Sequence, residues 1–287
     1  MAKLILSAFA DEYNRDIDVQ IAMLQEREIP YLEPRFIGPR NISELSMEEV
    51  KGLKSRLENI KVFSIGSPLG KINLADDFVA HCEVAKRVFD TANVLDAKCV
   101  RMFSFYLHKG KSKVECRAEV IDKIGQMIDL AKKYDITLCH ENEAEIYGES
   151  PDNCLDLMET FGGELNCVFD MGNFVLGGFK PFSDAYQKLK NYIRYFHIKD
   201  ALALGAVVPP GCGEGCIYEI LSSYLNEFER DVLITLEPHL QTFDGLNALV
   251  GRSFENPYKY ETQEIAFLDA LNRMEAMMDD IYRGVQC

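Results

Sequence analysis

The segment DITLCHENE, residues 135–143, contains the pattern that organises the whole chain. Its strand-forming residues 136–139 run directly into His140, Glu141, Asn142 and Glu143. A short run of this kind predicts a buried strand, and ionisable groups at the end of a buried strand need partners. The segment therefore predicts a strand whose carboxyl end holds something in place.

Seven other segments have the same strand-like character. They are LILSAFA (4–10), PYLEPRF (30–36), IKVFSIG (60–66), AKCVRMFSF (97–105), LNCVFDM (165–171), IRYFHIK (193–199) and VLITLEP (232–238). Successive segments begin roughly 26–40 residues apart, the size of a βα unit. The stretches between them carry helical periodicity, most clearly at 76–95 and 116–134.

Eight buried strands that alternate with helices predict a single (β/α)8 TIM barrel, and 287 residues suit that fold. A doubly wound open sheet is the alternative, but it favours a glycine-rich turn after the first strand, and AFADEYNRD has no glycine. We expect one domain over residues 1–287, with the barrel at about 4–240. Residues 241–287 form a C-terminal loop and helical extension, in which the apolar face is predicted to contain Ile265, Leu268, Leu271, Met274, Met278 and Ile281.

Composition narrows the class of protein. The formal net charge of −15 argues against a nucleic-acid partner, which would need concentrated lysine and arginine. The sequence has no run of about 18 apolar residues, so no membrane span is expected. The nine cysteines include no CxxC pair, and three lie in apolar strand-like runs, so we expect reduced thiols and a cytoplasmic protein.

Four potential metal ligands follow strongly apolar stretches. They are Glu141, Asp170, His197 and Glu237, from the last four predicted strands. If the strand ends point inward, three carboxylates and one imidazole converge on the face where such barrels build active sites. Without a cation these carboxylates would repel one another. The set therefore predicts one divalent metal ion, and Mn²⁺, Mg²⁺, Co²⁺ and Zn²⁺ all suit these ligand types.

The same residues stand in motifs that resemble those of a known superfamily. ENE (141–143), FDMGN (169–173), FHIKD (196–200) and LEPHL (236–240) resemble the strand-end motifs of the xylose isomerase-like TIM barrels. GSPLGKINLADDF (66–78), VRMFSFY (100–106) and PGCGEG (210–215) look like the sugar phosphate isomerase/epimerase branch. The resemblance covers about residues 4–240 and implies the fold more specifically than the substrate.

The resemblance implies that Glu141, Asp170, His197 and Glu237 bind the metal and that Glu141 and Glu237 are catalytic. It implies an isomerase or epimerase of a small sugar, sugar phosphate or related keto-polyol, which abstracts the proton next to a carbonyl through a metal-stabilised enediolate. Relatives are often dimers or tetramers, so a homo-oligomer is compatible with this interpretation.

Six further polar residues near strand ends are predicted to contact substrate: Glu33, Arg35, Arg101, Asn173, Lys199 and His239. Arg101 suits a carboxylate or phosphate, with a salt bridge to Glu141 or Glu143 as the alternative. Glu33 and Arg35 share one face of the second strand, either in the pocket or as an internal ion pair. By the same alternation His140 faces the helices and has no catalytic role.

Three other functions remain open at this point. A dehydratase of a polyhydroxylated keto compound would use the same proton abstraction and the same scaffold. An endonuclease IV-like DNA repair enzyme would need more histidines than the five present. A non-catalytic sugar-binding protein would not need all four ligand residues.

Overall fold

The barrel is built from one parallel sheet. The computed structural model describes residues 2–240, 256 and 258–284. The sheet contains β1 (Leu4–Ala8), β2 (Tyr31–Leu32), β5 (Lys61–Val62), β6 (Ser64–Ile65), β7 (Cys99–Met102), β8 (Thr137–Glu141), β9 (Leu165–Asp170), β10 (Ile193–Ile198) and β13 (Val232–Leu236). Its order is β5-β2-β1-β13-β10-β9-β8-β7-β6.

The sheet closes through its third segment. Only Phe63 separates β5 from β6, so the two are halves of one run. The first half pairs in parallel with β2 and the second half pairs in parallel with β7. The eight predicted strand segments thus occupy eight positions around a barrel, which confirms the predicted TIM barrel.

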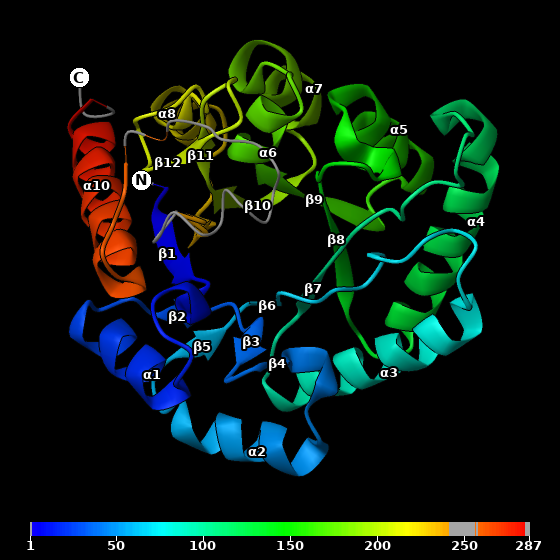
Figure 1. Cartoon of the computed structure of the whole chain (residues 1–287), viewed down its shortest axis with the longest axis horizontal. Helices are drawn as coiled ribbons and strands as arrows, with labels where there is room; N and C mark the ends of the chain where they lie inside the picture. The colour runs from blue at the N-terminus through cyan, green and yellow to red at the C-terminus, as the bar shows by residue number, and fades with distance from the viewer. Residues whose placement is uncertain (1, 241–255, 257, 285–287) are drawn as a thin grey trace.

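Helices surround the barrel (Figure 1). They are α1 (Ile17–Glu26), α2 (Met47–Arg56), α3 (Phe78–Val94), α4 (Lys113–Lys132), α5 (Pro151–Phe161), α6 (Met171–Leu176), α7 (Gln187–Leu189), α8 (Ile217–Glu227) and α10 (Gln263–Gly284). Several begin at side-chain caps: Ser46 and Ser112 form capping boxes with Glu49 and Glu115. The remaining described helical elements are the single turns η1 (Ala10–Glu12), η2 (Ile42–Glu44) and η3 (Tyr147–Glu149) and the π-helical η4 (Pro181–Tyr186). The remaining described strands form two hairpins, β3 (Phe36–Ile37)–β4 (Arg40–Asn41) and β11 (Asp200–Ala201)–β12 (Val207–Val208).

A small apolar cluster fills the barrel interior below the strand ends. It contains one residue from each strand position: Ile5, Tyr31, Phe63, Cys99, Cys139, Val168, Tyr195 and Leu233. Cys99 and Cys139 are fully buried, as expected of cysteines that act as small apolar side chains. Because strand side chains alternate, the residues two positions further along these strands face the same axis one layer higher.

The C-terminal helix α10 completes the ring of outer helices. Arg27, the residue directly after α1, donates to Asn272 of α10 at 2.7 Å, and Figure 1 shows α10 between α1 and α8. Leu271, Met274 and Ile281 are buried as predicted. The prediction was wrong for Ile265, which is 49% exposed, because the side chains that reach the barrel at this end are Ala266, Phe267 and Ala270. Most of the predicted loop between β13 and α10 lies outside the described residues.

Among the described residues, no helix is both long enough and apolar enough to cross a lipid bilayer.

The loop after β6 depends on a glycine. Gly70 has φ +83°, and a Cβ there would overlap the carbonyl oxygen of Phe103. We therefore expect Gly70→Ala to lower the free energy of unfolding by roughly 3 kcal/mol, from the left-handed backbone plus a steric clash. Chemical denaturation measures this. Gly110→Ala is the matched control, because Gly110 has φ +80° with nothing near its Cβ position, and it should cost only about 1 kcal/mol. Equal losses would contradict the argument.

Candidate active site

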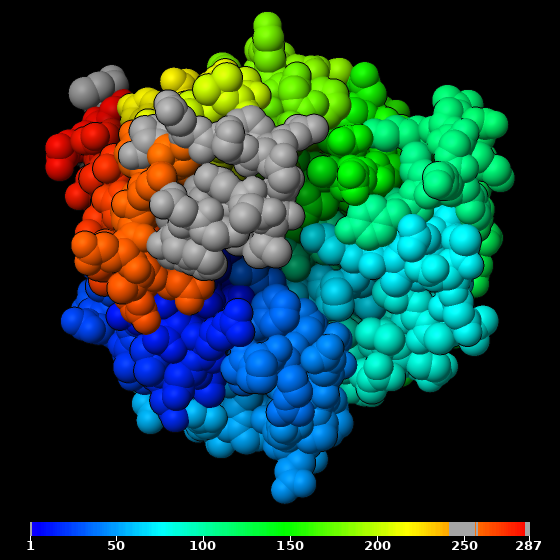
Figure 2. Space-filling view, in the orientation of Figure 1, coloured from blue at the N-terminus to red at the C-terminus, as the bar shows by residue number. Residues whose placement is uncertain are grey.

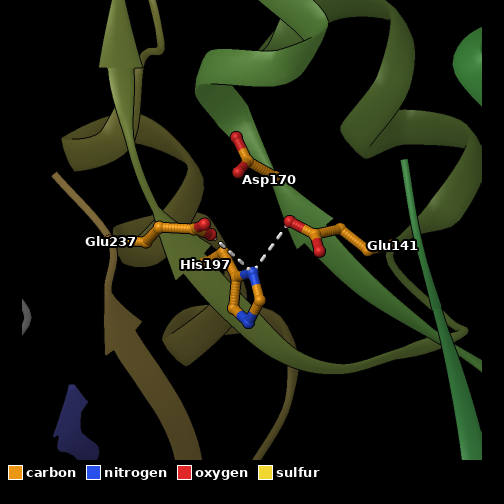
Figure 3. Close-up of side chains that lie close together, drawn as sticks. All are labelled: Glu141, Asp170, His197 and Glu237. Atoms are coloured by element: carbon orange, nitrogen blue, oxygen red, sulfur yellow. Dashed lines mark hydrogen bonds and ion pairs between the residues drawn. The ribbon is translucent and has the colours of Figure 1, made fainter. Parts of the chain in front are cut away.

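Four side chains meet at the carboxyl ends of four neighbouring strands (Figure 3). Glu141 ends β8, Asp170 ends β9, His197 lies in β10, and Glu237 follows β13 directly. Each is at most 3% exposed, and their ligand atoms all lie within 4.8 Å of one another. In the sheet register His197 pairs with Asp170 on one side and with Thr235 on the other, which places the four residues around one point.

An imidazole holds the two glutamates together. His197 Nδ1 lies 2.8 Å from Glu141 Oε1 and 2.9 Å from Glu237 Oε2. Burial disfavours charge on all three groups, yet Glu141 and Glu33 raise the pKa of His197 well above its usual value. In return, His197 and Arg101 overcome burial and lower the pKa of Glu141 to about 2. Lys199, His239 and His197 lower the pKa of Glu237 well below its usual value despite its burial.

The pKa of Asp170 is raised, unlike the pKa values of Glu141 and Glu237. Burial is the largest effect, and it is opposed by Lys199 and reinforced by Glu141 and Glu237, so the pKa of Asp170 is raised to about 7. Repulsion among three carboxylates in one buried place is therefore not fully cancelled by the surrounding side chains.

These residues fit a divalent cation. Glu141 Oε2 and Glu237 Oε2 are buried and accept no hydrogen bond from any described residue, although each has a cationic neighbour. An unsatisfied buried carboxylate oxygen is costly unless a cation neutralises it. Three carboxylates and one imidazole nitrogen suit several divalent ions.

Glu33 lies on the Nε2 side of His197, away from the other three candidate ligands. It is 1% exposed and accepts hydrogen bonds from Tyr195 Oη and from Thr235 Oγ1, both at 2.8 Å. His197 Nε2 is 3.2 Å from Glu33 Oε2. A carboxylate that accepts the Nε2 proton leaves the Nδ1 lone pair free to face the four-ligand site. The predicted internal ion pair with Arg35 is not formed, because Arg35 points to other carboxylates.

Lys199 is hydrogen-bonded to two residues of the FDMGN motif, Asp170 and Asn173. Lys199 Nζ donates to Asp170 Oδ2 at 2.8 Å and to Asn173 Oδ1 at 3.2 Å, and it lies 3.7 Å from Glu237 Oε2. The absence of a side chain at Gly172 makes this possible, since a Cβ there would lie 2.6 Å from Lys199 Cγ. Asn173 Nδ2 also donates to the carbonyl oxygen of Asn142 at 2.9 Å. Lys199 and Asn173 thus orient the candidate ligand Asp170.

Arg101 pairs with a metal-ligand candidate. Its Nη1 lies 3.1 Å from Glu141 Oε2, and its guanidinium packs against the rings of Phe9 and Phe103. Of the two roles predicted for Arg101, the structure forms the salt bridge to Glu141.

A second cluster adjoins Glu237. Arg35 Nη1 donates to Glu237 Oε1 at 3.0 Å, and the same guanidinium binds Asp11 and Glu12 at 2.9 Å. His239 lies on the other side, with its Nε2 3.0 Å from Glu12 Oε1 and 3.5 Å from Glu237 Oε1. Sequence reasoning did not select Asp11 and Glu12 as site residues, although their position directly after the first strand was the available signal.

His140 points away from the ligands, as predicted. It is fully buried, and its Nε2 lies 2.9 Å from Ser104 Oγ. Gly148 packs so closely on the ring that a Cβ there would overlap it. Burial lowers the pKa of His140 to about 4, so the ring is neutral at physiological pH.

Asp200 organises the loop that carries PGCGEG. Its carboxylate accepts four backbone N–H groups, from Ala201, Gly211, Gly213 and Gly215, each at 2.9 Å. A Cβ on Gly213 would overlap this carboxylate, so glycine at this position allows the loop backbone to approach the Asp200 carboxylate closely.

Comparison with known proteins agrees with the fold. The family model described as "Xylose isomerase-like TIM barrel" matches residues 24–269. No curated protein sequence matches the chain. The chain belongs to the xylose isomerase-like TIM barrel family.

Three solved structures illustrate the likeness. An IolI protein with a bound zinc atom has a TM-score of 0.72 at 17% identity, covering 97% of this chain and 99% of its own. A D-psicose 3-epimerase with D-tagatose from Clostridium cellulolyticum H10 has a TM-score of 0.72 at 13% identity, covering 96% and 99%. A probable 3-DHS dehydratase, AsbF, from Bacillus anthracis has a TM-score of 0.68 at 16% identity, covering 95% and 98%. At these identities the likeness shows the shared fold.

Glu33 provides a test of the ligand arrangement. We expect Glu33→Gln to weaken divalent-metal binding by roughly 10- to 100-fold, because the variant removes the carboxylate that orients His197. Calorimetric titration with Mn²⁺ measures the affinity, and circular dichroism checks the fold. Glu83→Gln, at an exposed position on α3, is the control and should bind as the wild type does. Wild-type affinity in Glu33→Gln would refute the orienting role.

Metal binding should also release protons. In the metal-free protein at pH 7, His197 is protonated and Asp170 is near half-protonated, because both pKa values are raised. A divalent ion needs both groups deprotonated, so we expect roughly one to two protons released per ion at pH 7. At pH 9 Asp170 is already ionised, so fewer protons should be released per ion than at pH 7. Titration calorimetry in two buffers of different ionisation enthalpy counts the protons, and zero release at both pH values would contradict this assignment.

Proposed function

We propose that the chain is a divalent-metal-dependent isomerase or epimerase of a small sugar or related keto-polyol. The single observation that carries this proposal is the convergence of Glu141, Asp170, His197 and Glu237, each buried and within ligand distance of the others. The known sugar epimerases on the same fold support it.

In this proposal, the four residues bind the metal ion, and carboxylates among them transfer the proton. Glu141, Asp170, His197 and Glu237 would hold the ion, which supplies Lewis-acid polarisation of the substrate carbonyl and its neighbouring hydroxyl. The C–H next to such a carbonyl becomes acidic enough for a carboxylate to remove its proton.

Glu141 and Glu237 are the two carboxylates that could accept that proton. Glu141 and Glu237 lie on opposite sides of the His197 ring nitrogen (Figure 3), and both have lowered pKa values, so both are ionised at neutral pH. One would remove the proton from one face of the substrate. The other, once it has taken up a proton from water, would return that proton to the opposite face and invert the carbon. Return of the proton to the neighbouring carbon would instead isomerise the substrate.

A dehydratase is the second candidate, because one structure with the same fold is named a probable 3-DHS dehydratase. The first step would be the same, and loss of a β-hydroxyl as water would follow. Mass analysis of the products separates the two candidates, because isomerisation conserves mass and dehydration removes one water.

The experiment is solvent deuterium exchange. The Mn²⁺-loaded protein is incubated with a panel of ketoses in D₂O, and deuterium next to the carbonyl is followed by NMR. We expect exchange in the wild type and a loss of roughly 100-fold or more in Glu237→Gln, which removes a ligand and a proton acceptor. Glu229→Gln, exposed on the loop after α8, should behave as the wild type does. Equal exchange rates in Glu237→Gln and wild type would contradict the proposal.

A further inference from the structure

Arg35 reaches from the end of one strand to a candidate metal ligand at the end of another. It follows β2, and the sheet order β2-β1-β13 places β1 between it and Glu237, which follows β13 directly. Its guanidinium packs on the ring of Phe9, the residue directly after β1, with Cζ 4.4 Å from the ring centre. Its Nη1 donates to Glu237 Oε1 at 3.0 Å. One side chain therefore joins the carboxyl ends of three neighbouring strands.

Two acids hold the guanidinium in this orientation. Arg35 Nε and Nη2 donate to Asp11 Oδ2 at 3.0 and 2.9 Å, and Nη2 also donates to Glu12 Oε1 at 2.9 Å. The side chains of Asp11 and Arg35 are 8% and 12% exposed, so little water competes for these hydrogen bonds. Because the guanidinium is planar, binding at Nε and Nη2 fixes the direction of Nη1, which points to Glu237.

The two oxygens of Glu237 have different surroundings. Oε1 accepts the hydrogen bond from Arg35, whereas Oε2 accepts none from any described residue. Oε2 lies 2.9 Å from His197 Nδ1 and 3.7 Å from Lys199 Nζ, on the side of the other candidate ligands. A hydrogen bond to one oxygen of a carboxylate restricts its rotation. Arg35 therefore determines which oxygen of Glu237 faces the four-ligand site.

We propose that Arg35 is a positioning residue for Glu237: it binds Oε1 and thereby presents Oε2 to the metal ion and to the substrate proton. This inference rests on the proposed function, in which Glu237 is both a metal ligand and a proton acceptor. Arg35 acts on the reaction through Glu237 and needs no contact of its own with the substrate.

Positioning and charge have opposite effects on metal affinity. A guanidinium beside a ligand oxygen repels a divalent cation, so removing its charge alone would strengthen metal binding. Removing a hydrogen bond that orients a ligating carboxylate weakens metal binding, typically by about 10- to 100-fold. The sign of the change in affinity therefore separates a positioning role from a purely electrostatic one.

Arg35→Ala provides the test. We expect this variant to bind Mn²⁺ roughly 10-fold more weakly than the wild type in titration calorimetry, with circular dichroism as the check of the fold. Arg35 lines a pocket of about 290 Å³, so guanidinium ion from solution can reach the place of the deleted side chain. A low, non-denaturing concentration of guanidinium chloride should restore most of the lost affinity, and sodium chloride at the same ionic strength should not.

Two further variants complete the experiment. Arg35→Lys keeps the charge that the surrounding acids need, and it serves as the second variant if Arg35→Ala does not fold. It should also bind Mn²⁺ more weakly, because an ammonium has no planar fork to hold Asp11 and Glu237 together. Arg117→Ala is the matched control, since Arg117 of α4 donates to Asp156 of α5 at 2.7 Å. It should bind Mn²⁺ as the wild type does, with or without guanidinium.

Wild-type or higher affinity in either folded Arg35 variant would overturn the inference. A loss of affinity in Arg35→Ala that guanidinium does not reduce would also overturn it, because the loss would then reflect general damage to the site. Failure of the wild type to exchange deuterium would count against the proposed reaction and would leave this binding result unaffected. Absence of Mn²⁺ binding by the wild type would contradict both proposals.

Discussion

The arrangement of charge in one buried place governs the upper half of this barrel. Glu141, Asp170 and Glu237 lie within a few ångströms of one another and away from water. Each buried carboxylate is costly unless a positive group faces it. His197, Lys199 and Arg101 supply that charge, yet two carboxylate oxygens still have no hydrogen bond within the described part of the chain. A divalent cation bound by these residues would neutralise the remaining negative charge, which supports the proposed metal site.

The barrel makes the arrangement rigid. The ligands come from neighbouring parallel strands, whose positions are fixed by backbone hydrogen bonds on both sides. Glu33, from the opposite part of the sheet, links His197 to Tyr195 and Thr235 across the axis. A ligand held by such a buried network keeps one orientation. The loops above can therefore differ without disturbing the candidate metal site.

Much of this could be predicted from sequence, because strand alternation decides which side chains share a face. It placed Cys139 and Glu141 toward the axis and His140 toward the helices. Alternation does not give the partner of a side chain, so the contact between Glu33 and His197 Nε2 was not predicted. The Arg35 cluster joins residues far apart in sequence, and only the closed barrel brings Asp11 and Glu237 to one guanidinium. The face of α10 at Ile265 depended on how the helix docks between its neighbours, which periodicity alone does not decide.

The most direct test of the account is an anomalous-difference map from crystals grown with Mn²⁺. The account predicts one strong peak within bonding distance of Glu141, Asp170, Glu237 and the Nδ1 atom of His197. It also predicts that Glu33 keeps its contact with the Nε2 atom. A map with no peak at these residues, or with His197 still bridging Glu141 and Glu237, would contradict it.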